Sequence, residues 1–252
     1  MPKSLSFPIR RLGLALALCL AAPAGAQDAY DPFEGFNRLM FGFNQRVDRY
    51  LLEPTARGYR AITPEPVDTG ISNFFSNLGD VSVLVNDLLQ FKFHQAAQDS
   101  SRLVFNTTFG LGGLIDVATP MGLPKHDEDF GQTLGYWGLG SGPYLILPLL
   151  GSSSGRDVWR WPVDSYLLDP LTAVDSGTVR ASATTLDLID TRADLLEAGS
   201  ILEEAALDPY TFQREAYLQR RLSLVHDGNP PRPDFDFDFD DEAEDEPPSA
   251  AP

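Results

Sequence analysis

The chain has 252 residues, a formal net charge of −17 and one cysteine. This length suffices for one large domain or two small ones with a buried core. The excess of acidic side chains and the lack of Lys/Arg clusters exclude a nucleic-acid-binding protein, and they argue against attachment to anionic lipid by charge alone.

Residues 1–26 predict a secretory signal peptide. Three basic residues precede the apolar run Leu12–Ala22, and Ala24-Gly25-Ala26 is a suitable cleavage site. Cys19 lies inside the apolar run, but it follows Leu18 where a lipoprotein signal requires a small residue. Lipidation at Cys19 and cleavage after Ala26 therefore both stay open. Cleavage would leave the mature chain without cysteine.

Residues 27–232 predict one mainly α-helical domain that begins with an amphipathic helix. This helix should run from Asp31-Pro32 to about Leu52, where Pro54 should stop it. Such a helix packs into a core or lies in a membrane interface with its aromatic face against lipid. The expected apolar face contains Phe33, Phe36, Leu39, Met40 and Phe43.

The apolar spacing predicts further helices along the chain. Asp80 is expected to cap the second of them, and two nearby tryptophans in 157–168 suit a core or a membrane interface. The predicted helices are Val67–Asn77, Val81–Leu89, His94–Phe109, Thr178–Ala198 and Tyr210–Val225.

A glycine-rich stretch from Phe109 to Arg156 holds 11 of the 21 glycines. Such a density predicts tight turns or backbones packed closely together, and one short hairpin is expected here. The apolar runs Leu111–Ala118 and Tyr144–Leu150 are too short to span a bilayer. They fit either a buried core or the wall of a passage.

One motif raises an enzyme hypothesis. Gly151–Gly155 matches G-x-S-x-G, which would make Ser153 the nucleophile of an esterase. The only later histidine, His226, lies beside the acidic tail, and the surrounding helices do not build a parallel sheet. A Ser/Gly loop explains the motif better. The three histidines are scattered, so no metal site or cofactor is predicted, and Asp127–Asp129 are expected to cap the next helix.

Residues 233–252 predict an acidic disordered tail. From Asp234 to Glu246 the chain has nine acidic side chains and no basic one. Like charges at this density cannot form a core.

Many short sequence blocks lie in order between about Asp31 and Gly228. They are Asp31-Pro32-Phe33-Glu34-Gly35-Phe36-Asn37-Arg38, Phe43-Asn44, Ser72-Asn73-Phe74, Asn77-Leu78, Asn106-Thr107, Gly110-Leu111-Gly112-Gly113-Leu114-Ile115-Asp116-Val117-Ala118, Phe130-Gly131-Gln132-Thr133-Leu134-Gly135, Gly142-Pro143-Tyr144, Leu147-Pro148, Gly155-Arg156-Asp157, Arg192 and Asp208-Pro209-Tyr210. Together these blocks resemble the MlaA (VacJ) family.

The resemblance implies a Gram-negative outer-membrane component on the periplasmic, inner-leaflet side. Members of the family look like a ring of amphipathic helices embedded in the membrane beside a trimeric porin. Phospholipid from the outer leaflet passes through a central amphipathic channel to a soluble periplasmic carrier of the MlaC kind. No bond is made or broken, and no cofactor is needed.

The resemblance also suggests site residues. Polar groups are needed for the head group and apolar groups for the acyl chains, and the aromatic face of the first helix should contact lipid. The expected channel residues are Leu111, Leu114, Asp116, Phe130, Gln132, Thr133 and Leu134. Two other classes stay open, namely a soluble periplasmic lipid-binding protein and the Ser153 esterase.

Overall fold

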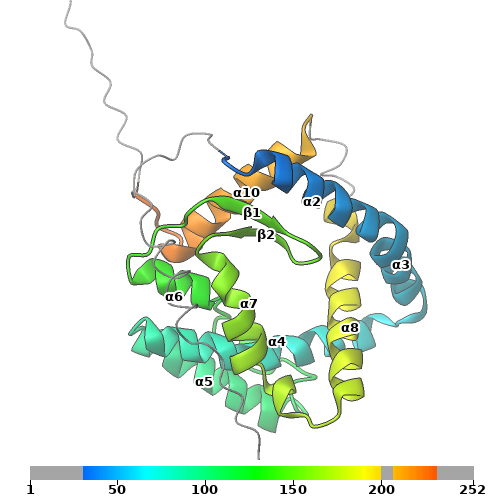
Figure 1. Ribbon diagram of the computed structural model, residues 1–252. Coiled ribbons are helices and arrows are strands. Elements are labelled where there is room, and N and C mark those ends of the chain that lie inside the picture. Colours follow the sequence, from blue (N-terminus) through cyan, green and yellow to red (C-terminus); the bar gives the residue numbers. More distant parts are fainter. Residues whose placement is uncertain (1–30, 200–206, 232–252) are drawn as a thin grey trace, which may run out of the picture.

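A computed structural model describes residues 31–199 and 207–231. Its helices are arranged as a ring around a central opening (Figure 1), as the mainly α-helical prediction expected. The predicted signal peptide with Cys19 and the acidic tail lie outside the described residues.

The first helical arm follows the N-terminal prediction only in part. Helix α2 (Glu34–Val47) continues through a π-helical turn, η1 (Asp48–Leu52), into α3 (Glu53–Ile62). The prediction that Pro54 stops the helix was wrong. Pro54 lies in the first turn of α3, next to a π turn, and the wider π turn accommodates its missing N–H.

Helices α4 (Glu65–Leu89) and α5 (Phe93–Thr108) pack side by side. The two expected helices before Phe93 are one continuous helix, so the prediction of Asp80 as an N-cap was wrong. Asp80 is 1% exposed and pairs with Lys125. This tertiary ion pair stabilises a helix that continues through Gly79. A glycine within a helix is only about 1 kcal/mol less favourable than alanine.

Three of the remaining helices begin at capping side chains. Asp129 caps α6, Ser176 caps α8 and Asp208 caps α10. The remaining elements are η2 (Thr119–Met121), α6 (Phe130–Tyr136), η3 (Asp157–Trp159), α7 (Arg160–Pro162), η4 (Val163–Leu168), η5 (Pro170–Ala173), α8 (Gly177–Asp194) and α10 (Pro209–Val225).

The glycine-rich stretch contains the expected hairpin. Strands β1 (Tyr144–Leu147) and β2 (Gly151–Ser154) pair in antiparallel register. Tyr144 and Ile146 turn toward Tyr210 of α10 and form the hydrophobic core cluster with it. Close backbone packing is also found at Gly113, where a Cβ atom would lie 2.7 Å from Asn77 of α4.

The ring closes through contacts between elements far apart in sequence. Asp190 of α8 accepts hydrogen bonds from Tyr59 of α3 (2.6 Å) and Ser72 of α4 (2.7 Å). On the other side, Arg38 of α2 binds Asp208 at the start of α10 (2.8 Å). The first and last described helices are therefore fastened to each other.

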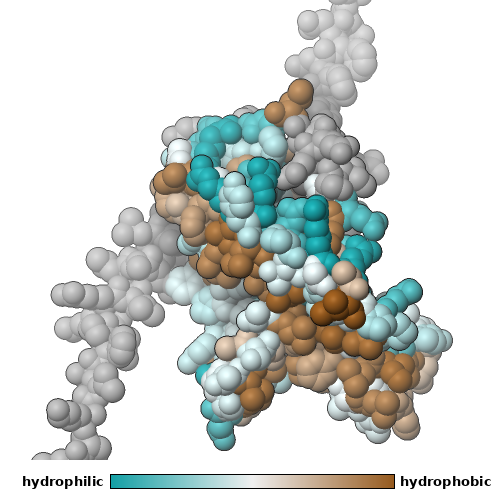
Figure 2. Space-filling view, turned by 90° about the vertical axis from the view of Figure 1, so that its right-hand side faces the viewer, coloured by the Kyte–Doolittle hydropathy of each residue, from teal (hydrophilic) through white to brown (hydrophobic). Residues whose placement is uncertain are grey.

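Burial in this ring departs from that of an ordinary soluble domain. Within 31–199 and 207–231, buried side chains are mostly polar or charged, while many large apolar side chains are exposed. Figure 2 shows hydrophobic residues gathered over the lower half of one side of the ring. The exposed set includes Phe91, Phe93, Phe109, Leu111 and Met121. None of the helices in these two ranges is long and apolar enough to cross a membrane.

Candidate functional site

One side of α8 borders a hollow of about 680 Å³. This side differs from the one that carries Asp190 and its bonds to α3 and α4. Small side chains recur every three or four residues, so the helix leaves space beside its backbone. The lining residues are Gly177, Thr178, Ala181, Ser182, Thr185, Leu186 and Ile189.

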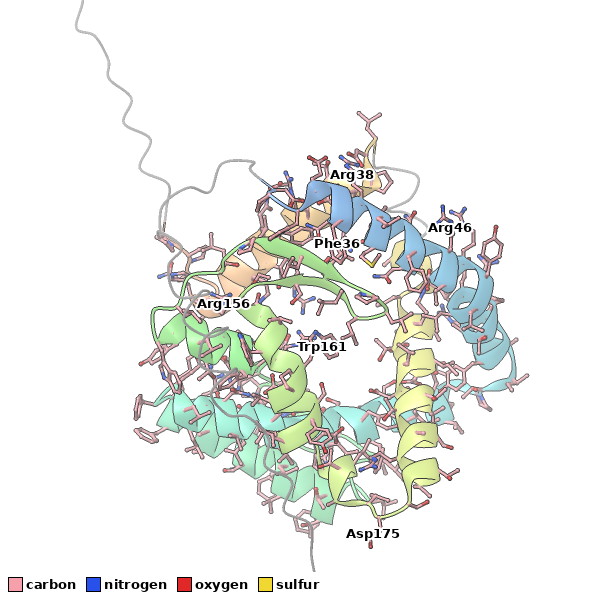
Figure 3. The ribbon with its side chains drawn as sticks, viewed as in Figure 1. Phe36, Arg38, Arg46, Arg156, Trp161 and Asp175 are labelled. Carbon is pink, nitrogen blue, oxygen red and sulfur yellow. The ribbon has the colours of Figure 1, made fainter. Side chains whose placement is uncertain are left out.

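Across the ring from α8, α7 carries Trp161. Figure 3 shows Trp161 beside the central opening, whereas Arg38 and Arg46 lie on the outer side of α2. The guanidinium carbon of Arg160 lies 4.8 Å from the centre of the Trp161 ring, a cation–π contact. The aromatic ring of Trp161 beside the opening therefore has a positively charged group stacked on it.

Two asparagines of α2 hold the hairpin. Asn37 is fully buried; its Nδ2 donates to the Tyr144 carbonyl (3.0 Å), and its Oδ1 accepts from the Ile146 amide (2.8 Å). Asn44, two turns later, makes the same pair of bonds to Leu147 (2.9 Å) and Leu149 (2.8 Å). The hairpin backbone is thus bound at two points on α2, two turns apart.

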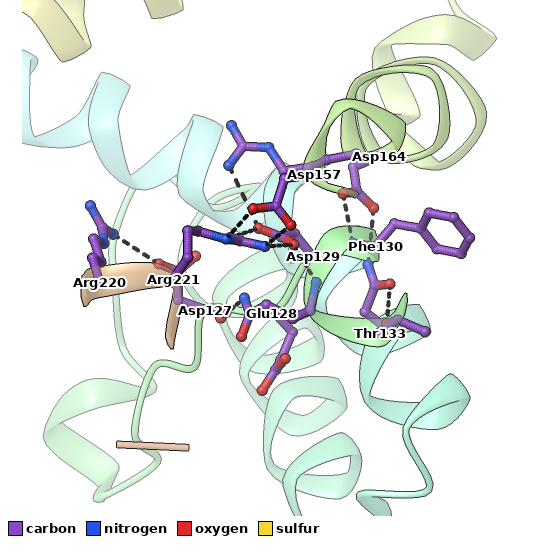
Figure 4. Close-up of polar contacts among 12 residues, drawn as sticks. Asp127, Glu128, Asp129, Phe130, Thr133, Asp157, Asp164, Arg220 and Arg221 are labelled. Atoms are coloured by element: carbon purple, nitrogen blue, oxygen red, sulfur yellow. Dashed lines mark hydrogen bonds and ion pairs between the residues drawn. The ribbon is translucent and has the colours of Figure 1, made fainter. Parts of the chain in front are cut away.

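A buried cluster of ion pairs joins α10 to α6 and to the segment after β2 (Figure 4). Arg221 donates to both oxygens of Asp129 (2.6 and 2.9 Å) and to Asp157 (3.1 Å). Arg156 is the second partner of Asp157 (2.8 Å). A Cβ atom at Gly131 would lie 2.5 Å from Asp157, so this cluster requires glycine there.

Both carboxylates of this cluster are held in the ionised state. Burial alone raises the pKa of Asp129, but the hydrogen bonds and charge of Arg221 outweigh it and bring the pKa below its ordinary value. Burial opposes ionisation of Asp157 in the same way, and Arg221 and Arg156 lower its pKa. The cluster is therefore structural, and its charges are used within the protein.

A second polar cluster lies between α4, α5 and the loop before α6. Asp87 and Asp99 are fully buried, and His126 Nδ1 lies 2.8 Å from Asp99 Oδ2. Burial raises the pKa of Asp87, and the nearby Asp99 and Glu128 raise it further, to about 8. At neutral pH Asp87 therefore carries a proton.

The structure divides the expected channel residues between two places on α4. Leu114 lies against the first half, where its carbonyl accepts from Asn73 (3.3 Å), and Thr133 lies against the second half, bonded to Asn86 (2.7 Å). Thirteen residues of helix separate these contacts by roughly 20 Å. The expected residues on the loop after α5 are Leu111, Leu114 and Asp116, and those on α6 are Phe130, Gln132, Thr133 and Leu134.

Two of these residues need correction. Gln132 and Thr133 are 1% and 0% exposed. Gln132 donates to the carbonyl of Asp127 (2.7 Å) and Thr133 to Asn86. Gln132 Oε1 has no partner among the described residues, but both side chains are buried and so do not face a head group in this structure.

Asp116 is also used inside the protein. Partial burial opposes its ionisation, but hydrogen bonds from Thr119 outweigh burial and lower the pKa to about 2. Arg102 lies 3.3 Å away. Leu111 and Leu114 are 69% and 46% exposed and contact solvent directly.

The expected apolar face of the first helix is largely exposed. Phe33, Phe36, Leu39 and Phe43 are 41–63% exposed. Met40 is partly buried and packs against the cluster of Tyr144, Ile146 and Tyr210.

Ser153 does not have the geometry of a nucleophile. It pairs with Leu145 in the middle of the hairpin and is 2% exposed, rather than lying at a turn from strand to helix. The described histidine contacts are elsewhere, with His126 at Asp99 and His226 at the Leu222 carbonyl. No group of three or more metal-ligating side chains occurs in the two described ranges.

Arg160 and the side of α8 that carries small residues were not singled out from the sequence. The small residues between Gly177 and Thr185 do share one helix side, which is a detectable signal. Small residues are neither strongly apolar nor strongly polar, however, so the amphipathic pattern of the helix was assigned from its larger apolar residues alone.

Known proteins resemble this chain over most of its length. Residues 29–223 match the family described as MlaA lipoprotein. A relative from Escherichia coli (strain K12), the intermembrane phospholipid transport system lipoprotein MlaA, is 38% identical over 229 residues, covering 86% of this chain and 87% of the relative. A relative of the same name from Haemophilus influenzae is 34% identical over 201 residues, covering 79% and 80%. A solved structure described as the structural basis for maintenance of bacterial outer membrane lipid asymmetry is 38% identical, with a TM-score of 0.68, covering 78% of this chain and 99% of that chain.

Proposed function

Because the chain belongs to the MlaA lipoprotein family, we propose that it works in intermembrane phospholipid transport. It removes mislocalised phospholipid from the outer leaflet of the outer membrane through the centre of the ring. The reaction is a transfer without bond chemistry, so it needs neither a cofactor nor a nucleophile.

The distribution of side chains carries this proposal. A soluble domain rarely exposes so many large apolar residues, whereas a ring lying among acyl chains needs them on its outer surface. Phe33, Phe36, Leu39 and Phe43 are exposed together on α2. In lipid, apolar side chains gain little by packing against another helix rather than against acyl chains. Buried polar networks, such as Asp190 with Tyr59 and Ser72, would therefore hold the helices of the ring together.

We place the passage between α8 and α7. The side of α8 that carries small residues leaves room beside the helix, and Trp161 of α7 lies beside the central opening in Figure 3. Leu111, Leu114, Phe130 and Leu134 remain candidate apolar contacts for acyl chains.

The family supports an association with the outer membrane, and we propose that the protein lies on its periplasmic side. We propose a porin trimer as the membrane partner and a soluble periplasmic lipid carrier as the acceptor. Crosslinking in intact cells tests both partners. Intact mass of the mature N-terminus decides whether Cys19 carries acyl chains.

Surface-exposed phospholipid in cells that lack this protein tests the proposed function. Exposure should rise on deletion and return to normal with the wild type and with Ser153→Ala. Failure of Ser153→Ala alone to restore it would favour the esterase. Unchanged exposure on deletion, with the protein in the soluble fraction, would favour a soluble lipid-binding protein.

A further inference from the structure

Arg160 is the one cation of the cluster around Asp129 that lacks a carboxylate at hydrogen-bond distance. Its Nη1 lies 3.6 Å from Asp129 Oδ2, whereas Arg221 already binds both oxygens of Asp129 at 2.6 and 2.9 Å. Asp157 is bound by Arg156 and Arg221. Within 31–199 and 207–231, Arg160 therefore makes only this long ion pair with Asp129, and none of its N–H groups makes a hydrogen bond.

Asp164, on the same segment of the chain, does not neutralise the charge of Arg160. Asp164 accepts hydrogen bonds from Ser82 (2.9 Å), Asn86 (3.0 Å) and the Phe130 amide (2.9 Å). These neutral donors occupy its oxygens on the side of α4 and α6. Asp164 is thus committed to joining α7 and η4 to α4.

Exposure separates Arg160 from the other arginines of the cluster. Its side chain is 41% exposed, against 6% for Arg156 and 7% for Arg221. The stack on Trp161 at 4.8 Å restricts the guanidinium to one orientation, so less conformational freedom is lost when it binds a ligand. Trp161 lies beside the central opening (Figure 3).

A fixed guanidinium with unused N–H groups matches a phosphate group, because its forked donors bind two phosphate oxygens at once. We propose that Arg160, stacked on the Trp161 ring that lies beside the central opening, binds the phosphate of a phospholipid there and makes the protein prefer phosphate-bearing lipids. This inference rests on the proposed function.

The charge of the whole protein favours a phosphate carried by lipid over a free ion. The chain has a formal net charge of −17, so its field repels small soluble anions. A lipid gains apolar contacts from its acyl chains, and these offset the repulsion. The apolar part of the ligand and the phosphate are therefore both required.

The test compares two fluorescent lipids with identical acyl chains, phosphatidylglycerol and diacylglycerol, binding to the purified full-length protein in detergent. Arg160→Gln should weaken phosphatidylglycerol binding by about 10- to 100-fold, as expected for charge-assisted hydrogen bonds, and leave diacylglycerol binding unchanged. Arg160→Lys, which keeps the charge without the fork, should fall between wild type and Arg160→Gln. Arg46→Gln, on the outer side of α2, is the matched control and should bind both lipids as the wild type does.

Other outcomes overturn the inference. Equal weakening of both lipids by Arg160→Gln would mean a packing role, and no weakening of either would mean no role. Displacement of phosphatidylglycerol by millimolar inorganic phosphate would refute the requirement for a lipid-borne phosphate. A wild type that binds neither lipid would refute the proposed function as well, whereas wild-type binding unaffected by Arg160→Gln refutes only this inference.

Discussion

Replacing Asp87 with asparagine should stabilise the protein at neutral and mildly alkaline pH. Asp87 lies in α4 with 0% exposure, and neither carboxylate oxygen has a hydrogen-bond donor among the described residues. Burial raises the pKa of Asp87, and Asp99 and Glu128 raise it further, to about 8, although Lys92 acts in the opposite direction. The buried site therefore favours the neutral acid.

The direction of the pH effect follows from proton binding. An ordinary aspartate has a pKa of 3.8, so between pH about 4 and 8 the folded protein keeps a proton that the unfolded chain has lost. The free energy of unfolding therefore falls as pH rises through this window. One pKa unit corresponds to about 1.4 kcal/mol, so the loss at pH 7 relative to acid is on the order of 2–4 kcal/mol.

Asparagine removes this loss because it has the same shape and cannot ionise. Its NH₂ group can also donate to Asp99, whose Oδ1 has no described partner. Asp87→Asn should match the wild type near pH 4 and exceed it by an increasing margin up to pH 8.

Denaturant unfolding in detergent, followed by circular dichroism at several pH values, measures this margin. Asp127→Asn is the control, because that side chain is 70% exposed and is paired only with the exposed Arg220. A variant that is less stable than the wild type by a constant amount at every pH would refute the reasoning, since it would mean that the ionised form of Asp87 is needed.

Three further substitutions test other parts of the structure. Asn37→Ala leaves a buried carbonyl and a buried amide of the hairpin without partners, and it should lower the free energy of unfolding by denaturant by on the order of 2–4 kcal/mol. The control Asn229→Ala, at an exposed position, should change this free energy little. Equal effects of the two substitutions would refute the role of Asn37 in holding the hairpin. Gly131→Ala places a methyl group against Asp157 and should lower the free energy of unfolding by about 1–3 kcal/mol. Wild-type stability of this variant would show that the ion-pair cluster around Asp157 can rearrange to make room for the methyl group. Leu114→Glu should raise the amount of surface-exposed phospholipid while the protein stays at the membrane. Leu207→Glu, at a fully exposed position before α10, is the control and should not raise it. A normal amount of surface-exposed phospholipid with Leu114→Glu would show that Leu114 does not line the passage.

The helices with local capping signals could be predicted from the sequence. Ser176 and Asp208 cap α8 and α10 as their side chains suggest, and Pro209 marks the start of α10. The hairpin was expected from the glycines and the short apolar run that begins at Tyr144. In these places local conformational preference and tertiary structure agree.

Other features depend on partners far away in the sequence. Gly79-Asp80 has the local pattern of a helix start, but Lys125 binds Asp80 and the helix continues. Thr133 has the chemistry of a channel residue, yet Asn86 and Gln90 use its hydroxyl inside the protein. Such pairings set burial, and no local pattern reveals which polar side chain finds a partner.

The contact between α2 and α10 has a consequence for how the protein is made. Asp31 and Tyr210, which share a hydrogen bond, are separated by 179 positions, and Arg38 and Asp208 by 170. A contact between residues so distant forms late, because the loop between them must close first. The N-terminal helix is therefore synthesised long before the last helix exists, and Phe41, whose ring packs against Tyr210, lacks that partner in the meantime. We expect a chain cut short before α10 to aggregate more readily than the complete ring.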